Sequence, residues 1–195
     1  MDAVYACEGH IPELAGDRVR LRRLTEDDAA DMLRCWSDPD TRKFTALPAM
    51  HAAADAAALI AWLNAMSEEE DALRWGIELT GSGRVIGSCG LNQWQLAGAY
   101  RGEFGCELAS DCQGKGFMTE AAELAMRFAF QEMGLNRIEA FVQPGNARAV
   151  RFFERLGYTR EGVLREYRHT STGYADAVVF SMLKRDWNHR KGEVG

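Results

Sequence analysis

The clearest hydrophobic pattern in the chain runs from residue 117 to residue 131. Apolar residues recur there at intervals of three and four, and polar residues occupy the opposite side. On the polar side, Glu123 precedes Arg127 by about one helical turn, which is a favourable order for an ion pair. The pattern predicts an amphipathic helix whose apolar face consists of Ala121, Leu124, Ala125, Phe128 and Ala129.

Three further segments have helical spacing. Thr25 with Asp28 is a capping signal for a first helix, which should end where Pro39 disfavours helical backbone in the residue before it. Residues 51–67 predict a second helix, and a third begins at Asn146. The expected apolar faces are Ala29, Met32, Leu33 and Trp36 in the first helix, Leu59, Trp62, Leu63 and Met66 in the second, and Ala149, Phe152, Phe153 and Leu156 in the third.

Period-two alternation and intervening turn residues mark the strands. A meander comes first, two strand–helix units follow, and a hairpin closes the chain. This order matches neither a pure alternation of strands and helices nor an all-antiparallel fold, so it predicts an α/β fold with a mixed sheet. The expected strands are residues 17–24, 74–79, 84–94, 103–108, 136–142, 158–168 and 174–184.

The domain organisation follows from length and pattern. A chain of 195 residues without internal repeats or low-complexity linkers is expected to form one domain. Residues 1–16 lack periodicity and are expected to form an N-terminal arm or loose segment. The domain should then span residues 17–187, and residues 188–195 should form a C-terminal tail.

Composition excludes several classes of function. The net charge of −6 is unfavourable for a general nucleic-acid binder and suits a cationic substrate. No apolar run approaches a membrane span, and residues 1–16 lack the apolar segment of a secretory signal. Five cysteines without C-x-x-C spacing indicate free thiols in a reducing compartment, so a cytoplasmic protein is expected. Four scattered histidines predict no metal site.

A glycine-rich loop, residues 113–116, precedes the long amphipathic helix. The first N–H groups of that helix have no intrahelical partners, and together with the helix dipole they favour an anion. Gly114 and Gly116 allow positive φ and a close approach of a phosphate, and Lys115 adds positive charge. A tight turn without a ligand is the alternative interpretation.

Two common nucleotide-binding motifs fit this loop poorly. A P-loop requires Ser or Thr directly after the lysine, and neither follows Lys115. A dinucleotide fingerprint requires a third glycine where Thr119 stands. Neither motif therefore identifies the anion that this loop would bind.

The loop carries a resemblance to a known family. Gln113-Gly114-Lys115-Gly116-Phe117-Met118 resembles the pyrophosphate loop Q/R-x-x-G-x-G/A of the GNAT acetyltransferases, although Met118 replaces the final Gly or Ala. The next residues, Thr119-Glu120-Ala121, are typical of the branch that acetylates N-terminal amines of ribosomal proteins. Asn146 at a helix start and the turn Leu156-Gly157-Tyr158 match a second family motif. Together the motifs cover roughly residues 18–187.

The resemblance implies a mostly antiparallel sheet flanked by helices, with two central strands splayed apart. Here these would be residues 103–108 and 137–142, and acetyl-CoA, the co-substrate, would insert between them. Residues 29–37 and 51–67 would wall the acceptor pocket. The expected cofactor-binding residues are Leu108 and Ser110, whose backbone groups would pair with the pantetheine amides, then Gln113, Gly114, Lys115, Gly116, Phe117, Met118 and Thr119 in the loop, and Asn146 and Phe153 beyond it.

Two residue roles bear on catalysis. Glu103 occupies about the place of a strand glutamate that some GNAT enzymes use as a base, and a carboxylate can take the proton of an amine. The alternative is a structural carboxylate paired with Arg101 or a backbone group. Glu107 lies on the same face of the strand by period two and is the next candidate.

The returning proton poses a separate question. Many GNAT enzymes donate it from Tyr or Ser on the helix led by Asn146, but here Phe153 and Ala149 stand at those positions and neither can donate. The remaining candidates for the proton donor are Tyr158, Tyr167 and a water, and the reaction could also proceed without a general acid. Asn146 itself is expected to cap its helix and also to bond the pantetheine arm.

The sequence therefore predicts a GNAT N-acetyltransferase that moves acetyl directly from acetyl-CoA to a primary amine. The favoured acceptor is a peptide N-terminus of the ribosomal-protein type. Acetylation of a small molecule, such as an antibiotic, polyamine or amino acid, is one alternative, and a non-catalytic acyl-CoA-binding or regulatory module is another. The expected assembly is a monomer or a homodimer, without nucleic acid or membrane.

Overall fold

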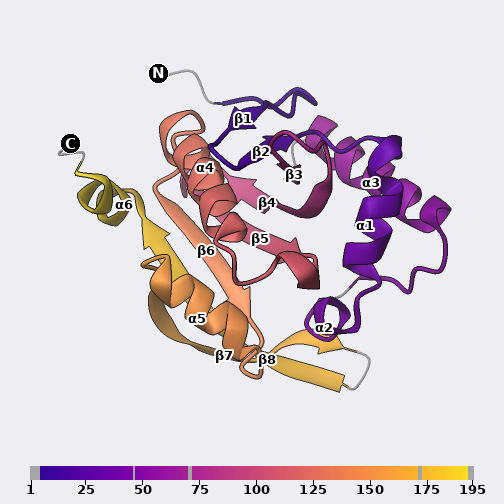
Figure 1. The fold of residues 1–195 in the computed structure, drawn as a ribbon. Coiled ribbons are helices and arrows are strands. Elements are labelled where there is room, and N and C mark those ends of the chain that lie inside the picture. Colours follow the sequence, from indigo (N-terminus) through magenta and orange to yellow (C-terminus); the bar gives the residue numbers. More distant parts are fainter. Residues whose placement is uncertain (1–4, 46, 70–71, 171–172, 193–195) are drawn as a thin grey trace.

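The computed structural model describes residues 5–45, 47–69, 72–170 and 173–192, and its centre is an eight-stranded sheet in the order β1-β2-β3-β4-β5-β6-β8-β7 (Figure 1). The strands are β1 (Leu14–Ala15), β2 (Val19–Arg22), β3 (Leu73–Leu79), β4 (Val85–Gln95), β5 (Arg101–Leu108), β6 (Arg137–Val142), β7 (Thr159–Thr170) and β8 (Gly173–Leu183). The helices are α1 (Ala29–Trp36), α2 (Pro39–Arg42), α3 (Ala53–Glu68), α4 (Phe117–Gln131), α5 (Ala147–Arg155) and α6 (Lys184–Lys191), with 3₁₀ turns at Glu26–Asp28 and Ser110–Cys112.

The sheet is antiparallel except between β5 and β6, which run parallel. These two strands pair only through residues 101–103 of β5 and 137–139 of β6. Beyond Glu103 and Glu139 they part, although β5 continues to Leu108 and β6 to Val142. The predicted mixed, mostly antiparallel sheet with two splayed central strands is confirmed.

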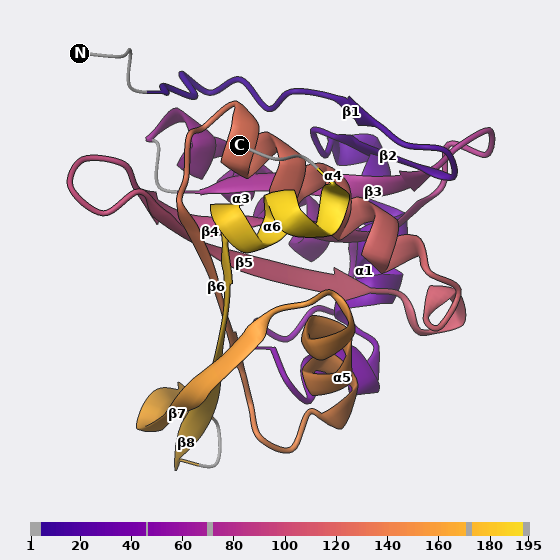
Figure 2. The same cartoon turned by 90° about the vertical axis from the view of Figure 1, so that its left-hand side faces the viewer.

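Helices cover both faces of the sheet. α1 and α3 pack against β3 and β4 on one side, here called the α1 face, and α4 packs on the other, here called the α4 face. α5 lies on the α4 face, and Figure 2 shows the β7–β8 hairpin extending away from α1 and α4. None of the described helices is both long and apolar enough to cross a membrane.

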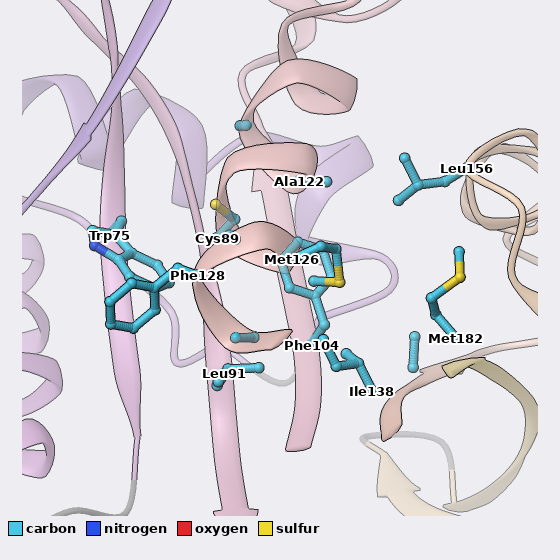
Figure 3. Packing of buried hydrophobic residues seen from close by; sticks show 14 of the residues in the cluster. Trp75, Cys89, Leu91, Phe104, Ala122, Met126, Phe128, Ile138, Leu156 and Met182 are labelled. Atoms are coloured by element: carbon cyan, nitrogen blue, oxygen red, sulfur yellow. The ribbon is translucent and has the colours of Figure 1, made fainter. Parts of the chain in front are cut away.

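The main core lies between the sheet and α4 (Figure 3). Phe128 of α4 meets the ring of Trp75 edge to face, with the ring centroids 5.6 Å apart. Phe104 of β5 and Ile138 of β6 extend this core across the sheet. Full burial of each large apolar side chain stabilises the fold by about 1.5–3 kcal/mol, so the periodicity of α4 is the main sequence feature that fixes this layer.

A second, smaller cluster joins α1 and α3 to the sheet. The apolar face predicted for the first helix is confirmed at Met32 and Trp36, which are buried. The face predicted for residues 51–67 is wrong at Trp62, whose surface is 57% exposed. Ala56 and Ile60 are buried instead, and Leu59 and Leu63 pack against the cluster only in part, so the buried side of α3 differs from the predicted face.

Residues 1–16 were expected to be an arm or loose segment, and the described part packs against the domain. Residues 14–15 form β1, which pairs with β2. Cys7 and Ile11 are buried, and the ring of Tyr5 meets Phe128 edge to face. Residues 1–4 lie outside the described residues. The packing was not visible in the pattern because the segment adds an edge strand of only two residues.

Two helices differ from the expectation. Asp38 and Pro39 end α1 as predicted, but they also begin α2, since the Asp38 carboxylate accepts hydrogen bonds from the N–H groups of Asp40 and Thr41 at 3.0 and 3.1 Å. The predicted tail at 188–195 begins inside α6, which continues to residue 191, and residues 193–195 lie outside the described residues. α6 has mostly polar side chains, so its periodicity gave no signal.

Candidate active site

The glycine-rich loop has the geometry of an anion site. Gly114 and Gly116 have φ of +74° and +83°, and Gly116 is the N-cap of α4. Only glycine adopts this region at little cost, so these two positions require the residue that the sequence supplies. The first hydrogen bond of α4 runs from the N–H of Glu120 to the carbonyl of Gly116, and the preceding N–H groups of the first turn face the loop.

Arg18 of the β1–β2 turn holds this loop in place. Its guanidinium donates to the Lys115 carbonyl at 3.0 Å and lies 5.2 Å from the centre of the Phe117 ring. The Glu120 carboxylate accepts from Nε and from the backbone N–H of Arg18, at 2.9 and 2.7 Å. Burial opposes ionisation of Glu120, but these hydrogen bonds lower its pKa. The contacts fix the start of α4 against the edge of the sheet.

Gln113 connects the loop to the end of β5 and to α5. Its Nε2 donates to the Leu108 carbonyl at 2.8 Å, and its Oε1 accepts a hydrogen bond from Arg148 of α5. The N–H of Gln113 also donates to the Ser110 carbonyl at 3.3 Å. In this structure the carbonyls of Leu108 and Ser110 therefore accept hydrogen bonds from Gln113. A ligand that donates to either carbonyl must replace the corresponding hydrogen bond from Gln113.

On the other side of the parting strands lie Asn146 and Phe153. Asn146 caps α5 as predicted, because its Oδ1 accepts from the Ala149 N–H at 3.0 Å. The Phe153 ring is buried between Phe104 of β5 and Phe180 of β8, with centroid distances of 6.4 and 5.8 Å. Aromatic side chains thus line the α4 side of the gap between β5 and β6.

Glu103 lies on the α1 face, at the last residue of β5 that pairs with β6. Its carboxylate accepts hydrogen bonds from Nδ2 of Asn92 at 3.1 Å and from Nε2 of Gln93 at 3.3 Å, and it pairs with Arg168 at 3.0 Å. The expected structural partner, Arg101, instead pairs with Glu139 of β6. A hollow of about 190 Å³ adjoins the carboxylate and is lined by Gln93, Trp94, Gln95, Arg101, Gly102 and Glu103.

Glu107 has a different environment on the same face. Its carboxylate accepts from Nε1 of Trp36 at 2.9 Å, from the Ser88 hydroxyl and from Arg74, with which it forms a buried ion pair. Burial opposes the charge of Arg74, but its interaction with Glu107 raises the pKa of that guanidinium. Trp36 of α1 contacts this carboxylate and its partner Arg74 is buried, whereas the partner of Glu103, Arg168, is 40% exposed, so we interpret Glu107 as a structural residue.

The two tyrosines considered as proton donors lie in different surroundings. Tyr158 is buried, its hydroxyl contacts the sulfur of Met126 at 3.0 Å, and burial raises its pKa well above the ordinary value. Tyr167 of β7 stacks on Phe141 of β6 with centroids 4.7 Å apart, and burial and the charge of Glu103 raise its pKa. Tyr167, not Tyr158, therefore lies on the side of the sheet where Glu103 is found.

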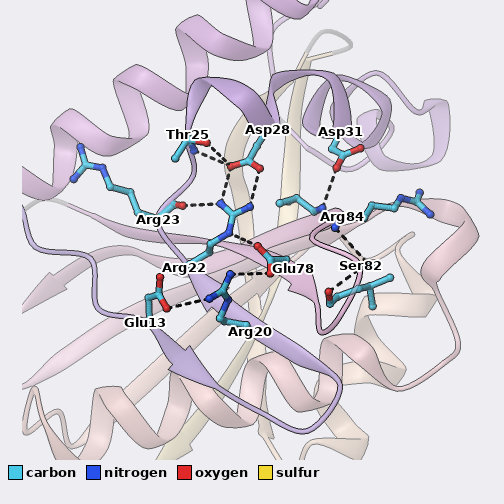
Figure 4. Close-up of polar contacts among 12 residues, drawn as sticks. Glu13, Arg20, Arg22, Arg23, Thr25, Asp28, Asp31, Glu78, Ser82 and Arg84 are labelled. Carbon is cyan, nitrogen blue, oxygen red and sulfur yellow. Dashed lines mark hydrogen bonds and ion pairs between the residues drawn. The ribbon is translucent and has the colours of Figure 1, made fainter.

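A third polar cluster lies under α1 (Figure 4). Arg22 of β2 forms a bidentate pair with Asp28, both distances being 2.8 Å, and also pairs with Glu78 of β3. The N–H of Thr25 donates to the same Asp28 carboxylate at 2.8 Å, which confirms the capping signal. Arg20 adds a second contact to Glu78 at 2.9 Å. These residues join β2, β3 and the start of α1, and lie apart from Glu103.

The cysteines form no disulfide among the described residues. Burial raises the pKa of Cys106, which faces Cys89 across β4 and β5, to about 12. Among the described residues, no group of three or more His, Cys, Asp and Glu side chains is placed to hold a metal ion.

Comparison with known proteins decides the family. The model of the GNAT acetyltransferase domain matches residues 18–159. The chain belongs to the GNAT family. The N-acetyltransferase p20 of Bacillus licheniformis, described as uncharacterized, is 33% identical over 171 residues, which are 88% of this chain and 96% of p20. The GNAT chain described here is thus an acetyl-CoA-dependent N-acetyltransferase.

Two further matches are a solved structure and a curated relative. RimJ of Mycobacterium smegmatis, solved in complex with CoA-disulfide, superposes with a TM-score of 0.81 at 21% identity, covering 95% of this GNAT chain and 97% of RimJ. That likeness concerns the fold. The [ribosomal protein uS5]-alanine N-acetyltransferase of Escherichia coli is 25% identical over 130 residues, 67% of each chain.

The sequence analysis of this GNAT chain missed the residues that hold Glu103. Arg168 lies 65 residues beyond it in the sequence, and no local pattern connects the two. Asn92 and Gln93 reach Glu103 because a register shift between Leu91 and Gln93 changes the pairing of β4 with β5. The contact between Arg18 and Glu120 was also missed, because the two residues lie 102 positions apart in the sequence.

Proposed function

We propose that this GNAT enzyme transfers acetyl from acetyl-CoA to the N-terminal amine of a protein, of the ribosomal-protein type, by direct transfer. The observation that carries the proposal is the parting of β5 and β6 immediately after Glu103. An anion-binding loop lies at one end of the opening and a carboxylate at the other. The acceptor class is supported by Thr119-Glu120-Ala121 and by the uS5-alanine acetyltransferase among the relatives.

The cofactor site that we propose follows β5 into the loop. The residues present suit acetyl-CoA, because Gly114 and Gly116 leave the backbone open for phosphates and the gap beyond Glu103 leaves the edge of β5 without a strand partner. Lys115 is exposed and contributes positive charge. The full set is Leu108, Ser110, Gln113, Gly114, Lys115, Gly116, Phe117, Met118, Thr119, Asn146 and Phe153.

Glu103 is the proposed general base. Acetylation forms a bond between the amine nitrogen and the acetyl carbonyl carbon and breaks the carbon–sulfur bond, so the amine must lose a proton and the departing thiolate must gain one. A protonated amine has no lone pair, and a carboxylate within reach, directly or through water, can remove its proton. Hydrogen bonds from Asn92, Gln93 and Arg168 hold the Glu103 carboxylate in one orientation.

For the proton returned to the thiolate we propose a water or Tyr167. Phe153 has no donor, and the hydroxyl of Tyr158 is committed to Met126 in the core. The ordinary pKa of tyrosine, about 10, already keeps the Tyr167 hydroxyl protonated at neutral pH, so that hydroxyl has a proton to donate. The variant Tyr167→Phe distinguishes Tyr167 from a water as the proton donor, since turnover falls only if the tyrosine hydroxyl donates the proton.

The proposal is tested by measuring CoA release with three sets of amines. The first contains peptides that begin with Ala or Ser, each paired with an otherwise identical peptide whose N-terminus is blocked. The second contains polyamines and the third aminoglycosides. We expect turnover with the free peptides and none with the blocked ones. Faster turnover with polyamines or aminoglycosides would replace the peptide proposal with small-molecule acetylation, without affecting the family assignment.

A further inference from the structure

The outer strand of the sheet, β7, has a bulge close to the proposed base. On β7, residues 165–167 separate Leu164 from Arg168. The partners of these two residues on β8 are separated by Asp176 alone, so three residues of one strand lie opposite one residue of the other. A bulge of this kind interrupts the ladder and changes the direction of the side chains that follow it.

The bulge allows two consecutive side chains to lie on one face of the sheet. In a regular strand Tyr167 and Arg168 would point to opposite faces. Here the Tyr167 ring stacks on Phe141 of β6 with the centroids 4.7 Å apart, and the Arg168 guanidinium lies 5.9 Å from the centre of the Tyr167 ring. Arg168 also pairs with Glu103 at 3.0 Å. A continuous set of contacts therefore joins β6, the bulge and the proposed base.

The backbone of the bulge is strained at Glu166. This residue has φ of +50°, which residues other than glycine adopt only where the surrounding structure holds them in place. The N–H of Glu166 donates to Oδ1 of Asp176, the residue of β8 opposite the bulge, at 2.9 Å. The Asp176 side chain therefore holds the strained residue from the neighbouring strand.

The position of Asp176 on β8 favours a role through this hydrogen bond over a role through its charge. Side chains alternate along β8, so Asp176 lies on the same face as Val178, which is buried in the main core on the α4 face. Glu103 lies on the opposite face. The Asp176 carboxylate is therefore poorly placed to attract a cationic amine to the proposed base.

We propose that Asp176 is a positioning residue for the acetyl transfer. By accepting the hydrogen bond from the N–H of Glu166, it keeps the bulge in the form in which Arg168 stacks on Tyr167 and pairs with Glu103. This role rests on the proposed function of Glu103 as general base. It adds that the orientation of the base depends on the backbone conformation of β7.

The first experiment compares Asp176→Ala with Asp176→Asn in steady-state CoA release. We expect Asp176→Ala to lower kcat by about 10–10²-fold, because a small displacement of a reacting group has an effect of that size, and to leave the KM for acetyl-CoA unchanged. The amide oxygen of Asn can accept the same hydrogen bond, so Asp176→Asn should retain most of the wild-type kcat. An equal loss of kcat in both variants would overturn the proposal, because the charge would then be the important property.

The second experiment relieves the strain directly. Glycine adopts positive φ at little cost, so Glu166→Gly should make the bulge independent of its hydrogen bond to Asp176. In the Asp176→Ala background it should restore most of kcat, and it also provides a folded protein if Asp176→Ala alone is too unstable to purify. A double variant with normal acetyl-CoA affinity and a kcat still reduced about tenfold or more would contradict the proposal.

Thr170→Val is the matched structural control. It removes the hydrogen bond from the Thr170 hydroxyl to the Gly173 carbonyl, 2.7 Å long, in the same hairpin but outside the bulge. It should lower stability in urea unfolding and leave kcat unchanged. A loss of kcat as large as that of Asp176→Ala would show that turnover follows the stability of the hairpin, and would overturn the positioning role.

The dependence on the base is measured by combining Asp176→Ala with Glu103→Gln. If Asp176 acts by orienting Glu103, its replacement should have little further effect in the Glu103→Gln background. Losses that add in full, or a normal kcat in Asp176→Ala beside a slow Glu103→Gln, overturn the positioning role and leave the general base in place. Normal turnover by Glu103→Gln removes the general base itself, and the positioning role with it.

Discussion

The two halves of the α1 face differ in what their ion pairs do. Under α1 and α3, the side chains of Asp28, Glu78 and Glu107 are at most 10% exposed and are bound by arginines of β2 and β3. Beyond β5 one partner of each pair is exposed, since the side chains of Arg168 and Glu161 are each 40% exposed, although the Glu103 side chain that binds Arg168 is as buried as that of Glu107. The two halves therefore differ in whether both partners of an ion pair are buried or one of them is exposed to solvent.

Glu103 and Glu107 illustrate how the surroundings of a glutamate decide its role. They lie four residues apart on one strand and face the same way, and each has three hydrogen-bond partners. Glu107 lies under Trp36 of α1, where its charge must be neutralised permanently. Glu103 lies beside a hollow at the point where β5 leaves β6, and its cationic partner comes from the exposed hairpin. Glu107 therefore stabilises the fold, whereas Glu103 is placed where it can act on a substrate.

The largest effect is expected from Glu103→Gln. A general base contributes typically about 10²–10⁴-fold, so turnover should fall by that factor, and the loss should shrink at high pH where more of the acceptor amine is already neutral. Affinity for acetyl-CoA should remain. Steady-state rates across pH, with kcat and KM separated, provide the measurement.

The matched control is Glu139→Gln, which removes a carboxylate on the adjacent strand that binds Arg101 and Arg137 and has no proposed role with the acceptor. Near-normal turnover by Glu103→Gln on its preferred acceptor would remove the general-base assignment. A loss confined to a raised acceptor KM would reassign Glu103 to attracting the cationic substrate.

Glu107→Gln should instead reduce stability. It leaves the buried Arg74 guanidinium without a counter-charge, and breaking a buried pair in this way costs about 3–5 kcal/mol. Urea unfolding followed by circular dichroism measures the change. Glu13→Gln, in a pair whose carboxylate is 62% exposed, should cost less than about 1 kcal/mol. Equal losses of unfolding free energy in the two variants would show that burial of an ion pair does not determine its contribution to stability.

Gly116→Val tests the loop that serves the open end of the site. Positive φ is unfavourable for a β-branched residue, and a Cβ at Gly116 would lie 3.1 Å from the Arg18 guanidinium. The loop should distort, and calorimetry should find acetyl-CoA binding weakened by about tenfold or more, which corresponds to about 1.4 kcal/mol.

Gly81→Val carries the same backbone strain, with φ of +82°, in an open turn between β3 and β4. It should lose stability to a similar degree and keep its acetyl-CoA affinity. If both variants bind acetyl-CoA as the wild type does, the cofactor does not use this loop.

The smallest effect concerns the exposed pair of Glu161 and Arg137. Hydrogen bonds from Arg137 and Ser181 lower the pKa of Glu161 to about 2, below its ordinary value near 4.3. The folded state therefore favours the ionised carboxylate. The resulting stability is fully present above about pH 4.3 and is lost as pH falls through about 2.

Because the Glu161 side chain is 40% exposed, solvent screening should keep this contribution below about 1 kcal/mol. The measurement compares unfolding of wild type and Glu161→Gln at pH 6 and about pH 2, at a protein concentration low enough to exclude association. The difference between the two proteins should shrink at the lower pH. A difference that grows on acidification would contradict the assigned direction of the pKa change.

Much of the architecture was readable from the sequence, because its causes are local. The period of α4 and the alternation of β2 reflect a buried face that repeats every few residues. The capping of the first helix by Thr25 and Asp28, and of α5 by Asn146, depends on hydrogen bonds across three residues. Gly114 and Gly116 marked the loop because positive φ excludes most other residues.

The tertiary structure decided the contacts and roles of the site residues, because these depend on residues far apart in the chain. Arg168 meets Glu103 across 65 positions, and Arg18 meets Glu120 across 102. The roles of Glu103 and Glu107 could not be told apart by strand phase, which places both on one face. Only the packing of α1 over one of them, and the parting of β5 from β6 beside the other, gave two identical side chains different surroundings.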